Sequence, residues 1–310
     1  MKVIYDVGKI DRTLTNAVLA IGVFDGLHLG HQKLIKAAVK KAKKMRVPAV
    51  VMTFFPHPVQ VLHPNCYLPF IVSLSHRLRL IKQLGVKACL VIPFTKKISQ
   101  LTAGQFVKKY LIRLFCPQEV YVGADFCFGK NRQGTVSYLM NAGQKYGFKV
   151  NAVAPVKAGN RKIGSSSIRH LIMRGRLNEA SRLLGRNVSL MGKVVKGEGR
   201  GKSLGFPTAN IFPENEMILP VGVYAVRVKT GHRMYKGMAN VGRRPSFKKN
   251  KNHINIEIHI FEFKKSLYGK EISVEFIKKI RNEKFFKSPQ ELTDQLARDT
   301  VTCKTILKSR

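Results

Sequence analysis

The alternation of apolar runs and helical repeats in residues 1–184 limits the fold of this chain more than any other feature. Residues 17–24 (AVLAIGVF) form a continuous apolar run, which is typical of a strand buried on both faces of a sheet. Residues 31–45 then place apolar side chains on one helical face and lysines on the other. Repeated strand–helix–strand units join parallel strands by right-handed crossovers. The pattern therefore predicts an α/β fold with a mostly parallel sheet.

The same alternation continues along this half of the chain. Thr102 is a suitable N-cap for one of the helices, because its hydroxyl can accept a hydrogen bond from a backbone N–H of the first turn. The predicted strands lie at residues 48–54, 88–94, 119–126 and 148–154, and the predicted helices at residues 75–85, 102–115, 135–147, 167–176 and 178–185.

After Gly185, short runs of alternating apolar and polar residues replace this pattern. Residues 224–229, 254–261 and 272–280 favour antiparallel strands, and the turn residues between such runs favour a small β-barrel. Residues 288–307 begin with Ser-Pro and repeat apolar residues with helical spacing, which predicts a C-terminal helix. The length of 310 residues accommodates two domains. We expect one at residues 1–184 and the other at residues 185–310.

Charge is the strongest signal in the composition, with 56 Lys and Arg against 17 Asp and Glu and a formal net charge of +39. Such a charge attracts polyanions, nucleic acids included. The basic residues are spread along the whole chain, however, and no RNA-binding aromatic signature accompanies them. General solvation by lysine is an equally open interpretation. We therefore expect no specific nucleic-acid partner.

The sequence also bears on compartment. No run approaches the roughly 20 apolar residues of a membrane helix, and the N-terminus lacks a signal-peptide pattern. The five cysteines are odd in number and never spaced as CxxC, which favours reduced thiols over a disulfide framework or a zinc cluster. We expect a cytoplasmic protein without a membrane partner. The oligomeric state is not indicated.

The few acidic residues of the first half are better functional candidates than the lysines around them. Only six acids precede Gly185, and two of them, Asp25 and Asp125, follow strand-like runs. Loops at the carboxyl ends of parallel strands are where an open sheet places ligand-binding groups.

Residues 22–34 (GVFDGLHLGHQKL) place His28 and His31 where the first buried strand gives way to a helix. Two histidines alone do not make a metal site, which needs three or four protein ligands, and an ordinary surface loop also explains either histidine. A phosphate site fits the context better, because free N–H groups and the helix dipole at a helix start favour an anion. Gly30 lets the backbone approach such a ligand closely.

The His-x-Gly-His motif recurs in nucleotidyltransferases and class I aminoacyl-tRNA synthetases. The longer strings GVFDGLHLGHQKL, TFFPHP, VGADFCFG and SSSIR, in this order, resemble bacterial bifunctional riboflavin kinase/FAD synthetases over nearly the whole chain. The resemblance implies a Rossmann-like nucleotidyltransferase domain followed by a riboflavin kinase barrel. It also implies ATP as co-substrate, Mg²⁺ as cofactor, and riboflavin, FMN and FAD as substrates or products.

For the adenylylation of FMN, the resemblance makes His28 and His31 the catalytic pair at the ATP triphosphate. Gly164 stands where the family motif Ser-Ser-Thr-x-Ile-Arg has its first Ser, and Ser166 where it has Thr, which puts one phosphate contact in doubt. Taken without the resemblance, SSSIR is a capped helix start. The implied ATP- or phosphate-binding residues are Gly22, Phe24, Gly30, Ser165, Ser166 and Arg169, and the implied flavin-binding residues are Asp125, Phe126 and Phe128.

For the phosphorylation of riboflavin, the resemblance concerns residues 192–210 and 254–261, together with the strings GMANVGRRPSF (residues 237–247), LYGKEI (267–272) and RNEKFF (281–286). GMANVGRRPSF resembles the substrate loop of the family, with Ser246 where Thr is usual. The GKS string at residues 201–203 is not a Walker A loop, because Lys196 stands where that motif needs glycine. A glycine-rich loop with basic residues can still wrap its N–H groups around phosphates, although a solvated hairpin is the simpler interpretation. The implied residues are Gly197, Gly199, Gly201 and Lys202 for phosphate, Thr208 and Asn210 for Mg²⁺, Arg243 for flavin and Glu257 as the catalytic base.

Two other functions remain open from the residues themselves. One is a different small-molecule adenylyl- or cytidylyltransferase with an appended β domain, against which PTAN (residues 207–210) and Glu257 count. The other is an RNA-binding protein built on a synthetase-like domain, which the charge alone suggests.

Overall fold

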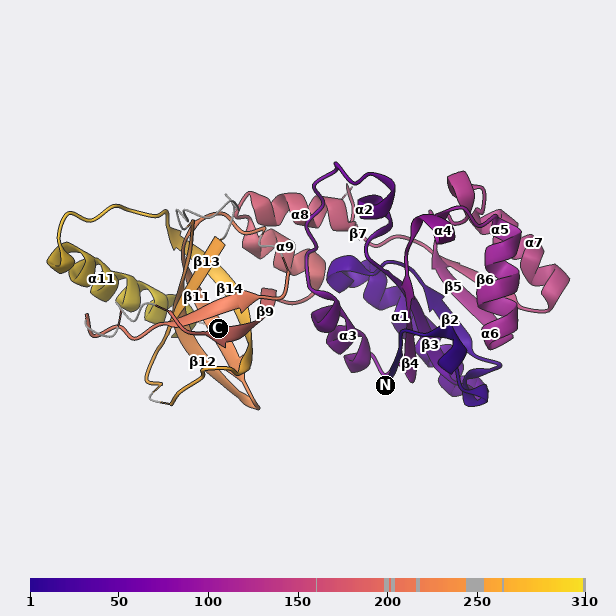
Figure 1. Ribbon diagram of the computed structural model, residues 1–310, viewed down its shortest axis with the longest axis horizontal. Helices are drawn as coiled ribbons and strands as arrows, with labels where there is room; N and C mark the ends of the chain where they lie inside the picture. Colours follow the sequence, from indigo (N-terminus) through magenta and orange to yellow (C-terminus); the bar gives the residue numbers. More distant parts are fainter. Residues whose placement is uncertain are drawn as a thin grey trace. The chain divides into compact units, whose positions relative to one another are not determined.

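The computed structural model describes residues 1–159, 161–197, 201, 204–215, 218–243, 254–263 and 265–308, with the backbone alone at residues 161, 243 and 254 (Figure 1). The chain divides into two compact units. Met1–Leu68 and Leu74–Gly164 form the first unit, and Pro69–Ser73 and Ser165–Arg310 the second.

A six-stranded parallel sheet is the centre of the first unit, in the order β1-β4-β3-β2-β5-β6. The side chains of β2 alternate between two apolar clusters: Leu19 and Ile21 belong to one, Val18 and Ala20 to the other. Both faces of the sheet are therefore buried, as the continuous apolar run predicts. The strands are β1 (Lys2–Ile4), β2 (Val18–Ile21), β3 (Ala49–Phe55), β4 (Ala88–Pro93), β5 (Glu119–Gly123) and β6 (Lys149–Val153).

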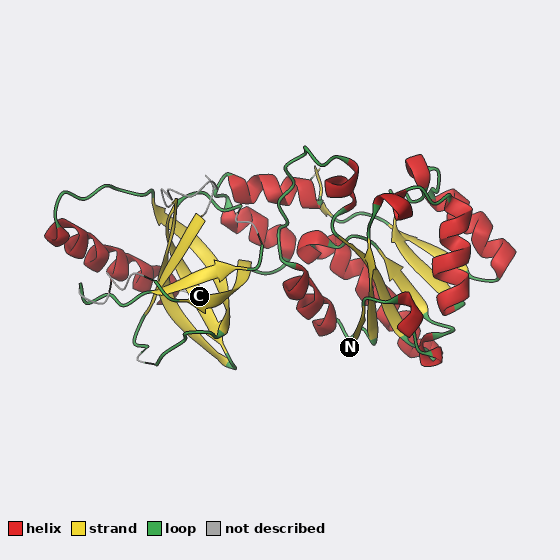
Figure 2. Cartoon of the chain, viewed as in Figure 1, coloured by secondary structure: helices red, strands yellow, loops and turns green. Residues whose placement is uncertain are grey.

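Helices cover both faces of this sheet (Figure 2). Thr102 forms the predicted N-cap through a capping box with Gln105, but the segment at 102–115 is α-helical only at its ends, with a π-helical stretch, η4 (Val107–Ile112), between them. The α-helices are α1 (Leu29–Met45), α2 (Pro58–Leu62), α3 (Leu74–Gln83), α4 (Lys96–Ser99), α5 (Ala103–Phe106), α6 (Arg113–Phe115) and α7 (Val136–Tyr146), and β7 (Lys157–Ala158) pairs with β8 (Arg161–Lys162).

The second unit contains a closed antiparallel barrel in the order β10-β13-β12-β11-β14-β9. Alternate residues of β11, among them Tyr224 and Val226, point into the barrel, while Val223 and Ala225 on its outer face pack against α11. β11 is thus buried on both sides. The elements are α8 (Ser165–Met173), α9 (Leu177–Leu184), β9 (Val188–Val195), β10 (Ala209–Pro213), β11 (Gly222–Thr230), β12 (Arg233–Arg243), β13 (Ile254–Ile260), β14 (Glu271–Arg281) and α11 (Pro289–Lys308).

The predicted fold class is confirmed: a parallel sheet with helices is followed by a small antiparallel barrel and a C-terminal helix. Within the described ranges we find no helix that combines the length and the apolar character of a membrane span.

Candidate functional site

In the first unit, we expect the binding crevice at the point where the strand order reverses. β2 lies between β3 and β5, so the chain moves across the sheet in one direction from β2 to β4 and in the other from β5 to β6. Ligands of open parallel sheets bind outside the carboxyl ends of the strands at such a point. The histidine loop follows β2 directly and Asp125 follows β5 by two residues. Two sequence-predicted elements thus lie at one edge of one sheet.

His28 is the N-cap of α1. Its side-chain Nδ1 accepts a hydrogen bond from the backbone N–H of His31 at 3.4 Å, and the two imidazole rings stack with centroids 3.6 Å apart. Since Nδ1 is the acceptor, the capping bond places the ring N–H of a neutral His28 on Nε2.

His31 lies in a desolvated position. Its Nδ1 is buried and has no hydrogen-bond partner within the described part of the chain. Burial lowers the pKa of His31 well below its usual 6.5, and the charges of His28 and Arg77 lower it further. His31 is therefore a neutral imidazole at neutral pH, suited to hydrogen bonding.

The glycines and the aromatic residue of the loop have packing roles that the structure makes visible. A Cβ on Gly30 would lie 3.1 Å from the His28 ring, and a Cβ on Gly22 would lie 2.9 Å from the Phe24 ring. The Phe24 ring itself is buried in the core and meets His31 edge-on at 5.2 Å. Phe24 thus supports a histidine from beneath, and its ring does not face the crevice as a ligand contact would.

A buried arginine beneath the histidine loop is absent from the sequence predictions. Arg77 of α3 is fully buried, and this burial lowers the pKa of its guanidinium. The nearby carboxylate of buried Asp25 partly offsets the lowering. Leu74, Arg77, Leu78 and Ile81 share one helical face. An arginine at a core position of an amphipathic helix is the sequence signal that would have identified it.

The predicted flavin residues after β5 separate into an exposed and a buried set. Asp125 is exposed, its carboxylate meets Lys162 Nζ at 2.6 Å, and this hydrogen bond lowers the pKa of Asp125. Phe128 is buried in the core, and the half-buried ring of Phe126 stacks on it at 5.5 Å. Asp125 and Phe126 are therefore accessible to a ligand, while the Phe128 ring supports Phe126.

The SSSIR motif begins α8 in the second unit, where Ser165 is its first residue and Ser166 is exposed. Arg169 is buried, and its Nε donates to the carbonyl of Pro69 at 2.8 Å. A Cβ on Gly164 would meet no described atom within 4 Å, so packing does not explain the loss of the family serine.

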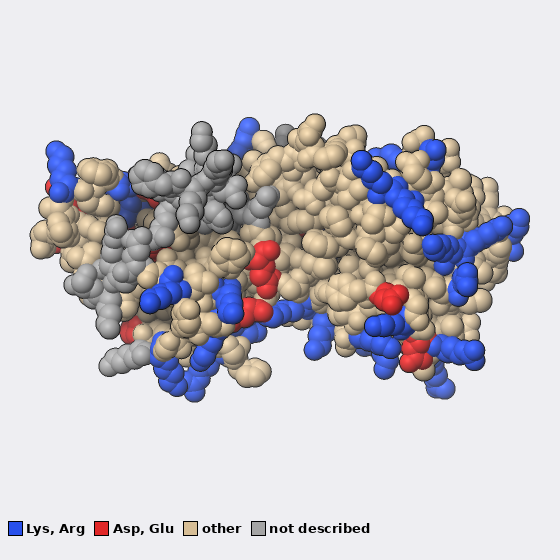
Figure 3. Space-filling view, in the orientation of Figure 1, with Lys and Arg blue, Asp and Glu red and all other residues tan. Residues whose placement is uncertain are grey.

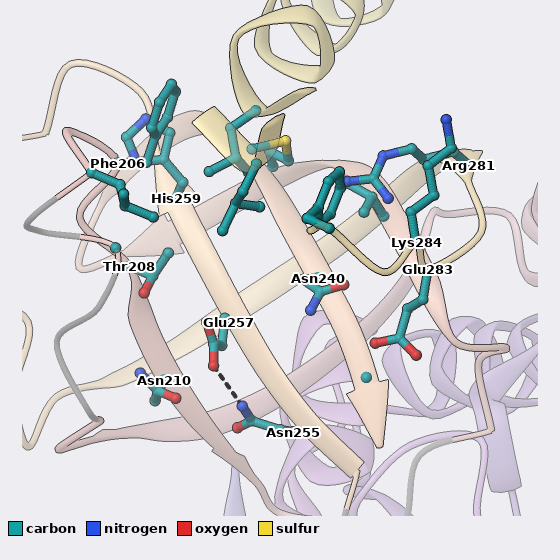
Figure 4. Close-up of a pocket in the computed structure, with 18 residues that line it drawn as sticks. Phe206, Thr208, Asn210, Asn240, Asn255, Glu257, His259, Arg281, Glu283 and Lys284 are labelled. Carbon is teal, nitrogen blue, oxygen red and sulfur yellow. Dashed lines mark hydrogen bonds between the residues drawn. The ribbon is translucent and has the colours of Figure 1, made fainter. Parts of the chain in front are cut away.

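The second unit holds a cavity of about 370 Å³ on the outer face of the barrel, between the strands and α11 (Figure 4). Glu257 of β13 is paired in register with Asn210 of β10 on one side and Asn240 of β12 on the other. Residues directly opposite in a sheet point to the same face. Thr208, two residues before Asn210, lines the same cavity.

The surroundings of Glu257 suit a proton acceptor. Asn255 Nδ2 donates to Glu257 Oε1 at 2.7 Å, which fixes the carboxylate and leaves Oε2 to take a proton (Figure 4). A Cβ on Gly197 would lie 1.9 Å from the Asn210 amide, so the backbone of the glycine-rich loop rests directly on this side chain. Predicted base, amide and loop glycine are thus brought together.

Oxygen donors in this cavity fit a hard cation. The hydroxyl of Thr208 and the amide oxygen of Asn210 are ligands that Mg²⁺ accepts while it keeps several waters. Groups of three or more His, Cys, Asp or Glu side chains able to hold a metal do not occur among the residues the structure describes.

The opposite wall of the cavity comes from the end of β14 and from α11. Arg281 lines the cavity, but its guanidinium is bound by buried Asp299 of α11, with Nη2 2.7 Å from the carboxylate. Glu283, Lys284 and Asn240 also line the cavity and were not assigned from the sequence. They lie inside the strings RNEKFF and GMANVGRRPSF, which match the kinase family as a whole but do not single them out.

Several predicted residues cannot be placed. Gly199, Lys202 and Ser246 lie outside the described residues, and only the backbone of Arg243, at the end of β12, is described. Gly201 lines the cavity.

On the face shown in Figure 3, basic side chains are scattered over both units with few acidic ones among them.

Comparisons with known proteins agree with the order of the two architectures. A family model described as FAD synthetase matches residues 10–167, and one described as riboflavin kinase matches residues 184–307. Proteins named bifunctional riboflavin kinase/FMN adenylyltransferase are 36% identical in Bacillus subtilis (strain 168), over 91% of this chain and 90% of that protein, and 35% identical in Escherichia coli (strain K12), over 93% and 91%.

A crystal structure gives the same picture of the fold. A chain from Streptococcus pneumoniae, named as a macrolide-efflux protein, superposes with a TM-score of 0.85 at 33% identity and covers 97% of this chain and 98% of its own. The efflux name is that protein's own, while the sequence relatives agree on the two flavin activities.

Proposed function

Because the chain belongs to the family of bifunctional riboflavin kinases/FMN adenylyltransferases, we propose that the histidine loop and the barrel cavity are its two separate active sites. The chain phosphorylates riboflavin to FMN and then adenylylates FMN to FAD. The proposal concerns which residues perform each step.

In the FAD synthetase domain, a phosphate oxygen of FMN attacks the α-phosphorus of ATP, and pyrophosphate leaves. FMN already carries the nucleophilic anion, so this step needs charge stabilisation and alignment and no strong base. His28, through Nε2–H, and His31 donate to phosphate oxygens whose negative charge grows in the transition state. Gly30 keeps the loop open beside them. Gly22 of the loop and Asp125 and Phe126 after β5 also belong to this site, and the buried rings of Phe24 and Phe128 support it by packing. For Ser165, Ser166 and Arg169 we keep the phosphate-binding role that the resemblance to the family implies.

In the riboflavin kinase domain, the ribityl hydroxyl attacks the γ-phosphorus of ATP, and its proton passes to Glu257 Oε2 as ADP leaves. The observation that carries this assignment is the register, which sets Glu257 directly beside Asn210 on the cavity face. Thr208 and Asn210 would hold Mg²⁺, which would neutralise charge on the ATP phosphates. The resemblance to the family assigns the phosphate loop to Gly197, Gly199, Gly201 and Lys202 and a flavin contact to Arg243.

The remaining attributes follow from weaker signals. We assign residues 1–184 to the adenylyltransferase domain and residues 185–310 to the kinase domain. The two family models support these limits, although α8 and α9 pack within the second unit. The cysteine pattern supports a cytoplasmic location. Small molecules are the expected ligands, without a specific nucleic-acid partner.

A pair of variants tests the assignment. His28→Ala is expected to abolish FAD formation while FMN accumulates from riboflavin and Mg-ATP, and Glu257→Ala is expected to stop riboflavin phosphorylation while supplied FMN is still converted. Chromatography of the flavins measures both, and each variant is the other's control. Loss of both steps in one variant contradicts two separate sites, and riboflavin phosphorylation near the parental rate in Glu257→Ala removes Glu257 as the base.

A further inference from the structure

The carbonyl oxygen of Val23, at the start of the histidine loop, accepts two buried side-chain hydrogen bonds. Thr53 Oγ1 of β3 donates at 2.8 Å and Arg77 Nη1 of α3 at 3.0 Å. Both side chains are fully buried. A backbone carbonyl that receives two such donors is fixed in position and orientation.

The chain beyond Val23 needs this support, because its conformation is unfavourable. Phe24 has φ 56° and Leu27 has φ 41°, with Gly26 at φ 72° between them. Left-handed backbone at residues other than glycine persists only where the surrounding structure enforces it. His28 follows immediately and caps α1, so the loop conformation sets where both imidazoles lie.

Arg77 also connects neighbouring strands. Its Nη1 reaches the carbonyl of Phe54 at 3.3 Å, so one guanidinium nitrogen joins the carboxyl ends of β2 and β3. Asp25, inside the loop, is buried close enough to influence the charge of Arg77. The cation therefore ties loop, strands and α3 together beneath the histidines.

We propose that Thr53 and Arg77 form a clamp on the Val23 carbonyl that holds His28 and His31 in position for adenylyl transfer. Both are positioning residues, since they act through the loop and do not face the crevice. The inference rests on the proposed role of the histidine pair. It gives the first residue of the TFFPHP string a role in the mechanism, as a donor beneath the loop.

Thr53 offers the sharper test, because its hydroxyl can be removed with little change in volume. In Thr53→Val the kcat of FMN adenylylation is expected to fall roughly 10- to 100-fold, since misplacement of catalytic groups by about 1 Å costs that much, while the KM for FMN changes less. Thr53→Ser keeps the donor and is expected to retain most of the parental kcat. Riboflavin phosphorylation in the same proteins serves as the internal control.

Thr15→Val is the matched variant, because Thr15 Oγ1 donates to the Arg12 carbonyl at 2.7 Å, away from the loop. It is expected to leave adenylylation unchanged. Parental kcat in Thr53→Val overturns the clamp, and so does an equal loss in Thr53→Val and Thr53→Ser, because the hydroxyl donor that Ser retains would then not preserve activity.

Arg77→Lys is a second test of the clamp, because the lysine ammonium keeps the positive charge but lacks the planar, fixed donors of the guanidinium. An intermediate kcat, with altered imidazole ¹⁵N chemical shifts of His28 and His31, is expected, whereas unchanged shifts and parental kcat contradict the clamp. His28→Ala separates the two levels of the argument. FAD formation that survives His28→Ala defeats the proposed site itself, whereas its loss there, with full activity in Thr53→Val, defeats the clamp alone.

Discussion

At the scale of single residues, Gly197 has no room for a side chain, since a Cβ there would lie 1.9 Å from the Asn210 amide. Because any Cβ at Gly197 would overlap this amide, Gly197→Ala must displace either the loop or the side chain. We expect riboflavin phosphorylation to fall about 100-fold, as misplacements of about 1 Å typically cause. Flavin chromatography with riboflavin and Mg-ATP measures the loss. Adenylylation of supplied FMN by the same variant is the control, and near-parental phosphorylation shows that Asn210 is not held by this contact.

The structure brings the polar candidates of the predicted kinase site together, whereas it buries two of the aromatic candidates of the other site. Glu257 and Asn210 alternate with apolar neighbours, so their common face follows once the strands pair. Phe24 and Phe128 follow strands as ligand-binding residues do, yet their rings are in the core. A ring at the end of a strand can turn toward either side, and sequence spacing does not distinguish the two.

At the scale of elements, the ion pair between Lys41 of α1 and Glu119 of β5 predicts a pH-dependent contribution to the free energy of unfolding. Burial raises the pKa of Glu119, but hydrogen bonds from Lys41, Tyr121 and Asn151 outweigh it, so the net pKa is lowered. Lys41→Met removes the ion pair at 3.0 Å and is expected to cost about 1–3 kcal/mol of stability at pH 7. Urea denaturation at pH 7 and in steps down to about pH 3 measures it.

The sign of the pH dependence follows from the lowered pKa. A carboxyl group whose pKa is lower in the folded state contributes stability above its unfolded value of 4.5, and this contribution is lost as pH falls through the folded pKa. The difference between the parental protein and Lys41→Met should therefore shrink in acid. Lys36→Met, at an exposed lysine of the same helix, is the control. A difference that persists undiminished at low pH points to lost packing of the lysine stem.

Long elements with clear periodicity were predictable, and short or interrupted ones were not. α1, α7 and α11 match their apolar repeats closely. β1 has three residues and pairs with β4, a contact that local sequence does not encode. The π-helical stretch η4 has ordinary helical composition, so its altered hydrogen bonding is a tertiary effect.

At the scale of the whole molecule, the change from helical repeats to short alternating runs after Gly185 predicted the order of the two architectures. It did not predict the packing of one short segment. Residues Pro69–Ser73 are enclosed by the first unit in sequence and belong to the second unit in space. Ser73 Oγ donates to Glu214 at 2.5 Å, and Asn215 Nδ2 donates to the carbonyl of Phe70 at 3.2 Å. Hydrogen bonds across more than 140 positions leave no mark on local periodicity.

The net charge of +39 allows a prediction about polyanions that separates attraction from recognition. Binding driven by scattered lysines releases counterions and weakens steeply with salt. We expect poly(U) to bind at about 50 mM salt, to lose at least about tenfold in affinity by about 200 mM, and to be replaced equally well by other polyanions. Fluorescence anisotropy of labelled poly(U), with heparin as competitor, measures this. Both flavin activities should be unaffected at the higher salt, because neither proposed site depends on the polymer. Tight binding that resists salt and prefers one RNA sequence would instead reveal a nucleic-acid function that the two active sites do not explain.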